Sequence, residues 1–273
     1  MAVSPFQADI LRRMAGGRGE GAGRTYVAGG LALNHVLGLG RLSRDIDVFN
    51  DSNEALRAAY EADTEALRAA GYEVRPRREG EGFAEAVVSR GGETTDVQWA
   101  RDSAFRFFPL ARDPLLGPTL HPFDLATNKL LALAGRREPR DWVDAVRCTE
   151  KVQCLGLLAW GACGKDPGYS PASLVEAVAR VRHVQDELDL AVASSVPVDA
   201  AELSRRWHDQ VAEARRWWEV LPPESAGCCV LDAAGRLFRG TPEQGREALA
   251  AGRLGFLRGR IGGQADGAAD AAQ

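Results

Sequence analysis

Two aspartates lie two residues apart at the start of a short apolar stretch. Residues 46–49 read Ile-Asp-Val-Phe, and Asp45 precedes them; these residue types favour a β-strand. Side chains at positions i and i+2 of a strand share one face, so Asp45 and Asp47 project together, opposite the core-forming Ile46. Two like charges at this spacing repel unless water solvates them, one carboxyl holds a proton, or a hard cation such as Mg²⁺ binds both.

A pair of glycines stands upstream of these aspartates. Gly29-Gly30 follows a strand predicted over 26–28 and precedes a short helix predicted over 31–37. Strand, glycine pair and helix form a phosphate-binding arrangement, because glycine lets the backbone approach a ligand and the helix N-terminus presents free N–H groups. A tight turn that needs a positive φ is the other explanation. Neither a P-loop lysine nor a dinucleotide-binding glycine pattern accompanies the pair.

Taken together, these segments resemble a known superfamily. Gly29-Gly30 followed by Ser43-Arg44-Asp45-Ile46-Asp47 resembles the signature of the DNA polymerase β-like nucleotidyltransferases. The form G-G-x-A-L…S-R-D-I-D-x-F is similar to the AbiEii/AbiGii toxin family, the nucleotidyltransferase half of type IV toxin–antitoxin and abortive-infection systems. Residues 124–144 resemble that family's helical segment K-x-x-A-L-x-x-R-x-x-x-R-D-x-x-D. The resemblance covers roughly residues 20–180.

A third carboxylate, Asp96, lies in a strand predicted over 94–99 whose apolar residues alternate to the opposite face. Two divalent ions about 4 Å apart must be balanced by several acidic groups, and in the resembling superfamily the third acid lies on such a strand. The resemblance therefore implies that Asp45, Asp47 and Asp96 bind two Mg²⁺ ions, with Mn²⁺ as the other candidate. An ordinary aspartate at the flank of a hairpin is the alternative for Asp96.

Lys129 lies in the apolar part of a helix predicted from 121 to 134. A lysine in such a place either extends its ammonium to water at the helix edge or supplies a cation to a bound ligand. The resemblance implies that Lys129 reaches the triphosphate. It also implies that Asp141, on the next helix, lies beside the active site and orients Lys129 or an arginine. Ordinary surface salt bridging is the alternative for Asp141.

The resemblance implies which groups would hold the nucleotide. The backbone of Gly29-Gly30 and the hydroxyl of Ser43 would bind phosphate oxygens, Arg44 would add charge, and Lys129 would stabilise developing negative charge. One metal ion would carry the nucleoside triphosphate and the other would activate the acceptor hydroxyl for in-line attack on the α-phosphorus. Catalysis of this kind depends on positioning and electrostatics.

The acceptor follows from the resemblance alone. Relatives in the toxin family modify the 3′ end of tRNA, which implies a tRNA acceptor, inhibition of growth and a cognate antitoxin protein. The same core also serves antibiotic nucleotidyltransferases, so the hydroxyl of a small molecule of the aminoglycoside type is the rival acceptor. An inactive nucleotidyltransferase-like binding scaffold is disfavoured, because all three carboxylates and Lys129 are present.

The order of predicted elements indicates an α/β (α+β) chain. Residues 1–120 predict a nucleotidyltransferase core with a small mixed sheet. Residues 121–261 predict a mostly helical domain that completes an active-site cleft, including one long helix from 170 to about 190 and a small hairpin over 228–239. The segment 262–273 lacks apolar bulk, so we expect a disordered tail.

The composition is that of an ordinary soluble protein, with 273 residues, 45% hydrophobic and 26% charged. A formal net charge of −4 argues against a strongly basic protein that coats nucleic acid, although a local patch can still hold RNA. No apolar run approaches membrane-spanning length and no signal peptide is evident, so we expect a cytoplasmic protein without membrane partners. The five cysteines lack a C-x-x-C pair and predict buried, reduced thiols.

Overall fold

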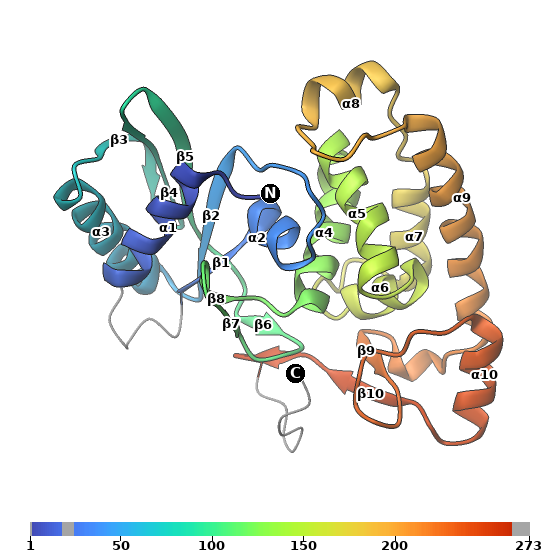
Figure 1. The fold of residues 1–273 in the computed structure, drawn as a ribbon. Helices are drawn as coiled ribbons and strands as arrows, with labels where there is room; N and C mark the ends of the chain where they lie inside the picture. The colour runs from blue at the N-terminus through green and yellow to red at the C-terminus, as the bar shows by residue number, and fades with distance from the viewer. Residues whose placement is uncertain (1, 18–24, 264–273) are drawn as a thin grey trace. The chain divides into compact units, whose positions relative to one another are not determined.

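The computed structural model describes residues 2–17 and 25–263. The chain divides into two compact units (Figure 1). We call them the sheet unit (Met1–Ala104, Leu110–His121 and Ala193–Val196) and the helical unit (Phe105–Pro109, Pro122–Val192 and Pro197–Gln273). The predicted disordered tail lies, from residue 264 onward, outside the described residues. The predicted domain limits and the cleft between the domains stay predictions.

The sheet unit is built on one mixed sheet of seven strands in the order β3-β4-β5-β2-β1-β8-β7. The central strands β2 and β5 run parallel, and so do β1 and β8, whereas the other neighbouring pairs are antiparallel. This mixed architecture confirms the predicted α/β class. The strands are β1 Thr25–Ala28, β2 Asp45–Asn50, β3 Glu73–Gly80, β4 Phe83–Arg90, β5 Glu93–Arg101, β7 Ala111–Asp113 and β8 Gly117–Thr119.

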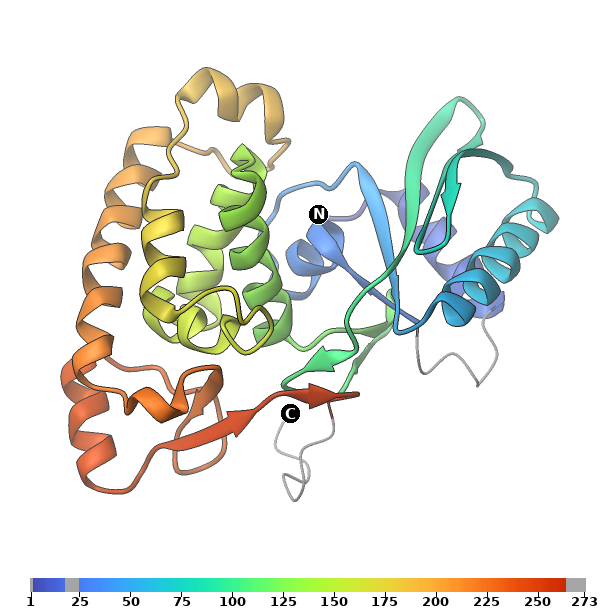
Figure 2. The same ribbon diagram turned by 180° about the vertical axis from the view of Figure 1, so that it is seen from behind.

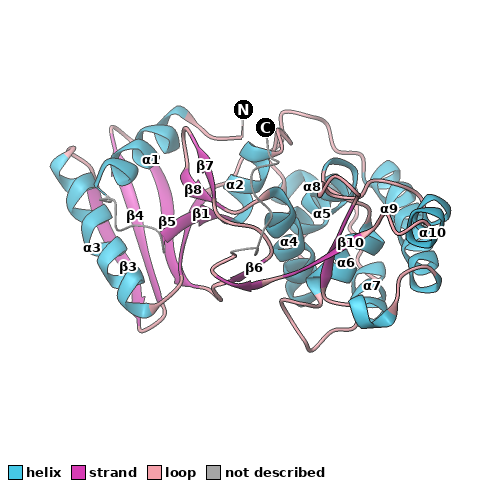
Figure 3. Ribbon diagram, turned by 90° about the horizontal axis from the view of Figure 1, so that it is seen from below, coloured by secondary structure: helices cyan, strands magenta, loops and turns pink. Residues whose placement is uncertain are grey.

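Helices α1 (Pro5–Gly17) and α3 (Asn53–Ala69) pack on each other and lie alongside the strands (Figure 3). Trp99 of β5 is fully buried, and its indole N–H donates to the carboxylate of Asp63 on α3 over 2.8 Å. The strand face that carries Trp99 is therefore the face that α3 covers. Because strand side chains alternate, the even-numbered positions of β5 lie on the other face of the sheet.

The helical unit contains seven α-helices among its described residues, with short strands at its edge (Figure 2). Its largest buried side chains include Trp142 and Trp217. The helices are α4 Pro122–Arg136, α5 Pro139–Lys151, α6 Leu155–Ala162, α7 Pro171–Ala179, α8 Gln185–Ala191, α9 Ala200–Arg216 and α10 Pro242–Ala250. The strands are β6 Phe105–Arg106, β9 Cys228–Leu231, β10 Gly255–Arg258 and β11 Arg260–Ile261.

The long helix predicted from 170 to about 190 is wrong, because the chain forms α7 and α8 with a break between them. At the break, Nε2 of His183 lies 3.0 Å from the carbonyl oxygen of Arg137, and the backbone N–H of Val184 donates to Glu187 over 3.1 Å. The carboxylate of Glu187 thus begins a new helix instead of continuing the old one. Helix propensity alone could not reveal this contact with a distant turn.

The small hairpin predicted over 228–239 is present: an antiparallel bridge joins Leu231 to Leu237, and the backbone N–H of Phe238 donates to the carbonyl of Val230 over 3.0 Å. Strand β9 also pairs antiparallel with β10, which follows α10, and this second partner was not predicted. The apolar residues Val230 and Phe256 meet across this pair. Val230 is buried in the core around Trp217, and both Phe238 from the local partner and Phe256 from the distant one pack against that core.

The five cysteines are free thiols, four of them buried and Cys154 partly buried. Burial raises the pKa of Cys154 and of Cys163 to about 12, so their thiolates are scarce at neutral pH. The predicted burial is confirmed for Cys148, Cys163, Cys228 and Cys229, but not fully for Cys154. Among the helices of the described chain, none is long and apolar enough to cross a membrane.

Candidate active site

The three predicted metal-binding aspartates lie on one face of the sheet. In the parallel pair of β2 and β5, Asp45 lies opposite Asp96, and Asp47 lies opposite Gln98. Paired positions present their side chains to the same face, and Asp96 faces away from the side on which α3 covers Trp99. Asp45, Asp47 and Asp96 therefore form one acidic group on the face that α3 leaves uncovered.

Asp47 is held close to the glycine pair. Helix α2 (Gly29–Val36) begins directly after β1, as predicted from strand, Gly-Gly and helix. Gly29 has φ of +68°, and a Cβ atom added to it would stand only 1.8 Å from Oδ2 of Asp47. Both the positive φ and this contact require glycine. The start of α2, where backbone N–H groups lack helical partners, is thereby placed next to the Asp47 carboxylate.

Ser43 and Arg41 lie at the other glycine. A Cβ on Gly30 would stand 2.6 Å from Nη2 of Arg41 and 3.2 Å from Oγ of Ser43. The Ser43 hydroxyl donates to Oδ1 of Asp45 over 2.8 Å. Ser43 therefore connects the helix start to the acidic group. Arg41, only 4% exposed, brings a guanidinium to the same place.

Asp96 is paired with an arginine from the edge of the sheet. Nη1 of Arg77 on β3 lies 3.3 Å from Oδ2 of Asp96 and 3.4 Å from Oε1 of Glu85 on β4. The Glu85 side chain is only 7% exposed, and Nε of Arg78 contacts its other oxygen at 3.2 Å. Glu85 lies opposite Gln98, so it shares the face of the three aspartates.

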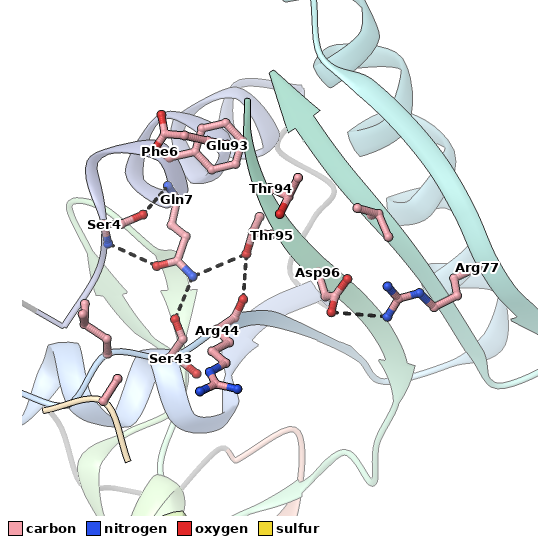
Figure 4. A pocket seen from close by; sticks show the side chains of 13 residues that line it. Ser4, Phe6, Gln7, Ser43, Arg44, Arg77, Glu93, Thr94, Thr95 and Asp96 are labelled. Carbon is pink, nitrogen blue, oxygen red and sulfur yellow. Dashed lines mark hydrogen bonds and ion pairs between the residues drawn. The ribbon is translucent and has the colours of Figure 1, made fainter. Parts of the chain in front are cut away.

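A pocket of about 500 Å³ opens beside Asp96, entirely within the sheet unit (Figure 4). Its polar lining includes Ser43, Arg44, Arg77, Thr95 and Asp96. Gln7 of α1 also lines the pocket, and Figure 4 shows its side-chain amide donating to the carbonyl of Ser43 at 2.9 Å and to the hydroxyl of Thr95 at 3.4 Å. The pocket thus joins two carboxylates, Asp96 and Glu93, to two guanidinium groups.

The donor chemistry of the acidic group fits a divalent cation such as Mg²⁺, which prefers carboxylate oxygens. Asp45, Asp47 and Asp96 supply those oxygens from neighbouring strands. Across residues 2–17 and 25–263, however, no group of three or more acidic, histidine or cysteine side chains stands in an arrangement that could hold a metal ion. The three aspartates have the ligand chemistry that the ion prefers, and they share one face of the sheet. Asp96, however, forms an ion pair with Arg77.

In the helical unit, Lys129 belongs to a buried ionic network. Its ammonium lies 2.7 Å from Oδ1 of Asp141 and 3.3 Å from Oδ2 of Asp144, and both carboxylates are fully buried. Nε of Arg136 donates to Asp141 at 2.5 Å. Burial alone would raise the pKa of Asp141, but the hydrogen bond from Arg136 and the charge of Lys129 outweigh burial and lower it. Asp141 therefore orients both Lys129 and an arginine.

The structure brings seven of the predicted site residues together in the sheet unit: Gly29, Gly30, Ser43, Arg44, Asp45, Asp47 and Asp96. Lys129 and Asp141 form a second group in the helical unit. Their roles in catalysis, metal binding and nucleotide binding stay predictions.

Sequence reasoning missed Arg41, Arg77, Glu85 and the full burial of Asp144. Only Asp144 carried a signal, because it follows Asp141 by three residues on a helix rich in apolar residues. The other three lie on strands or loops that meet the site through the sheet, and no spacing in the chain marks them.

Comparison with known proteins shows the family of this chain. The family model described as "Nucleotidyl transferase AbiEii toxin, Type IV TA system" matches residues 14–153. The solved structure of MenT4, a nucleotidyltransferase toxin from Mycobacterium tuberculosis H37Rv, is similar with a TM-score of 0.56 and 18% identity, covering 76% of this chain and 80% of that one. A putative nucleotidyltransferase from H. pylori has a TM-score of 0.51 and 14% identity, covering 77% and 94%.

No curated protein matches the chain. The likeness to the two solved structures concerns the fold, whereas the family model spans the glycine pair, the three aspartates and the Lys129 helix. Membership implies a nucleoside triphosphate as substrate, a divalent metal ion of the kind such enzymes generally use, and an antitoxin partner. With its acidic face beside the start of α2, the chain belongs to the AbiEii nucleotidyltransferase toxin family of type IV toxin–antitoxin systems.

Proposed function

We propose that the protein transfers a nucleoside monophosphate from an NTP to the 3′ end of tRNA and so inhibits growth. The observation that carries this proposal is the position of Asp47 against Gly29, beside Asp45 and Asp96 on one sheet face. This arrangement puts carboxylate oxygens next to free backbone N–H groups, which are the two partners that a metal-bound triphosphate requires.

Each residue of the sheet unit has a proposed role that follows from its position. The N–H groups at the start of α2 bind phosphate oxygens, and Arg41 adds positive charge at Gly30. Ser43 donates to Asp45 and so holds that carboxylate in one orientation. Asp45, Asp47 and Asp96 would hold Mg²⁺ or Mn²⁺, which would supply charge neutralisation at the transferring phosphorus and favour loss of the proton from the acceptor hydroxyl.

The transfer is a single in-line displacement. The acceptor oxygen forms a bond to the α-phosphorus, and the bond from that phosphorus to the bridging oxygen breaks. Pyrophosphate leaves with the bonding electron pair, and the hydroxyl proton passes to solvent. Helix-start N–H groups and cationic side chains near the phosphates stabilise the charge that accumulates on the leaving oxygens.

Lys129 and Asp141 are proposed as the helical unit's contribution. Asp141 and Asp144 hold the Lys129 ammonium in one place, and a lysine with a fixed position stabilises phosphate charge without further ordering. In this proposal Lys129 binds the triphosphate, and Asp141 is its positioning residue. An enzyme that uses NTP and tRNA meets both in the cytoplasm, which is the proposed location.

The test is to incubate the purified protein with total tRNA, each α-labelled NTP in turn and Mg²⁺. The comparison variant is Asp45→Ala/Asp47→Ala, and the matched control is Asp209→Asn, an exposed aspartate of α9. We expect label on tRNA with the wild type and Asp209→Asn only. A wild type that is stabilised by NTP and Mg²⁺ but labels an aminoglycoside instead of tRNA would move the acceptor to a small-molecule hydroxyl. Equal labelling by the double variant would contradict the assigned acidic group.

A further inference from the structure

Arg77 reaches the acidic face because of an irregularity in β3. The register between β3 and β4 shifts between Pro76 and Arg78, which makes Arg77 the extra residue of a β-bulge. Neighbouring residues of a regular strand point to opposite faces, yet Arg77 and Arg78 both contact Glu85. The bulge therefore turns Arg77 toward the face that carries Asp96.

Arg77 contacts two carboxylates, and neither of them needs Arg77 as its only possible cation. Glu85 has a second guanidinium from Arg78 at 3.2 Å, so this buried carboxylate remains paired if Arg77 moves. Asp96 depends on Arg77 for its ion pair at 3.3 Å, with side chains 38% and 51% exposed. An exposed pair of this kind is weak, so a divalent cation at Asp96 competes with it directly.

The pocket beside Asp96 can accommodate the Arg77 guanidinium after its ion pair with Asp96 breaks, because Arg77 already lines this pocket. Arg44 and Arg77 both line it, and Thr94 and Thr95 add hydroxyl groups. In the described part of the chain, the exposed Arg44 guanidinium makes no hydrogen bond or ion pair. A volume of about 500 Å³ is in the range of pockets for single small ligands, such as one nucleotide residue.

The order of strands indicates whether this pocket lies on the acceptor side or on the leaving-group side of the transferring phosphorus. Gly29 follows β1, whereas Arg77 lies on β3, and the strands β4, β5 and β2 stand between them. In-line displacement needs the leaving pyrophosphate and the attacking oxygen on opposite sides of the phosphorus. If the start of α2 binds the leaving phosphates, the pocket of Arg44 and Arg77 lies on the side of the acceptor.

We propose that this pocket binds the phosphodiester next to the acceptor hydroxyl of an RNA strand, and that Arg77 couples this binding to metal binding at Asp96. Without metal, Arg77 neutralises Asp96. When a divalent cation binds Asp96, Arg77 is released and joins Arg44 on the RNA phosphate. The inference rests on the proposed nucleotidyl transfer and adds the acceptor's phosphate as a recognised group.

Coupling of this kind is reciprocal. If metal frees Arg77 for RNA, then RNA that holds Arg77 must strengthen metal binding at Asp96 by the same factor. Two guanidinium groups favour a phosphate-bearing acceptor and oppose a polycationic one such as an aminoglycoside. The wild type should therefore bind metal and RNA with positive cooperativity, and removal of Arg77 should abolish this cooperativity.

The experiment measures binding without turnover. Free Mn²⁺ is followed by electron paramagnetic resonance in the wild type, Arg77→Gln and the matched control Arg78→Gln, which changes the other guanidinium on Glu85. Without RNA, we expect Arg77→Gln to bind Mn²⁺ about threefold to fivefold more tightly, since its competitor is gone. Arg78→Gln should stay within about twofold of the wild type.

The RNA arm uses a labelled single-stranded octamer at saturating Mn²⁺, with an uncharged morpholino oligomer of the same sequence as probe control. Arg77→Gln should weaken RNA binding about fivefold to tenfold, and the morpholino should bind weakly to every variant. In the wild type RNA should tighten Mn²⁺ binding, and in Arg77→Gln it should not. Equal Mn²⁺ affinity in wild type and Arg77→Gln, or equal changes in both arginine variants, would overturn the proposal.

A double-mutant cycle distinguishes the effect of the Arg77–Asp96 ion pair on Mn²⁺ affinity from the general effect of removing one positive charge. In an Asp96→Asn background, Arg77→Gln should no longer tighten Mn²⁺ binding, because the contested carboxylate is absent. An unchanged gain in that background would also overturn the inference. A failure of the proposed function gives a different result: the wild type transfers no label, while Mn²⁺ and RNA still strengthen each other's binding.

Discussion

The carboxylate of Asp47 lies so close to Gly29 that a Cβ on this glycine would stand 1.8 Å from Oδ2. Gly29 also has φ of +68°. The glycine thus serves two purposes, since it allows the turn from β1 into α2 and leaves room for an acidic side chain beside the helix start.

We expect Gly29→Ala to reduce nucleotide transfer by at least about a hundredfold, because Asp47 must move away from its place. Gly71 is the matched control, with φ of +80° and no atom within 4 Å of an added Cβ. Gly71→Ala carries a similar backbone strain of about 1–2 kcal/mol and should keep full activity. Thermal melts and label-transfer rates check both variants, and equal activity losses would contradict the steric explanation.

The hydrogen bond from Ser43 to Asp45 predicts a graded loss. Ser43→Ala should lower the rate of nucleotide transfer about tenfold and raise the Mg²⁺ concentration required, because partners of a metal ligand typically contribute 10–100-fold. Ser89→Ala, at a serine that contacts exposed Glu73, is the control. Rates over a Mg²⁺ series give the result, and an unchanged Mg²⁺ requirement would show that Ser43 does not orient Asp45.

The Asp141 network predicts a pH-dependent loss of stability. The pKa of Asp141 is lowered in the folded state, so its stabilising contribution is present above the unfolded value of about 3.9 and is lost as pH falls further. Asp141→Asn should reduce the free energy of unfolding by about 3 kcal/mol at pH 7. Urea titrations from pH 7 to pH 3 should show this difference shrinking below about pH 4, and a constant difference would contradict the ion pairing. Asp209→Asn is the control.

A second buried pair, Asp124 with Lys165, should matter only for stability. Asp124 is fully buried, lies 2.8 Å from the Lys165 ammonium and accepts backbone N–H groups of Phe107 and Phe108 at 3.0 and 3.1 Å. Lys165→Met leaves that carboxylate without its cation, so the free energy of unfolding should fall by about 3 kcal/mol. Urea unfolding measures this, with Lys151→Met at an exposed position as control. A stability equal to that of the wild type would contradict the assigned pairing.

Local patterns predicted much of the site. The alternation around Asp45 and Asp47 requires a shared face in any strand, and Gly29-Gly30 between apolar segments requires a turn into a helix. The position of Asp96 beside Asp45 was a harder inference, since it depends on which strands become neighbours. Here the family resemblance supplied what periodicity could not.

Local patterns failed where distant contacts compete with them. Residues 180–184 look compatible with one helix, but His183 meets the carbonyl of Arg137 and Glu187 caps a new helix start. Likewise, local patterns predicted the hairpin over 228–239 but not the second partner of β9, the distant strand β10, which packs Phe256 against the core that contains Val230. Propensity is a weak preference, and burial of an apolar side chain outweighs it.

The chain by itself determined the types and spacing of the reacting groups, because strand alternation and glycine stereochemistry are properties of a few consecutive residues. Only the tertiary structure decided which cations meet which carboxylates. Arg77 reaches Asp96 through a bulge and a strand order that bring residues 19 positions apart into contact. Lys129 is held by Asp141 and Asp144 because two helices pack together and exclude water, which makes pairing of the buried charges obligatory.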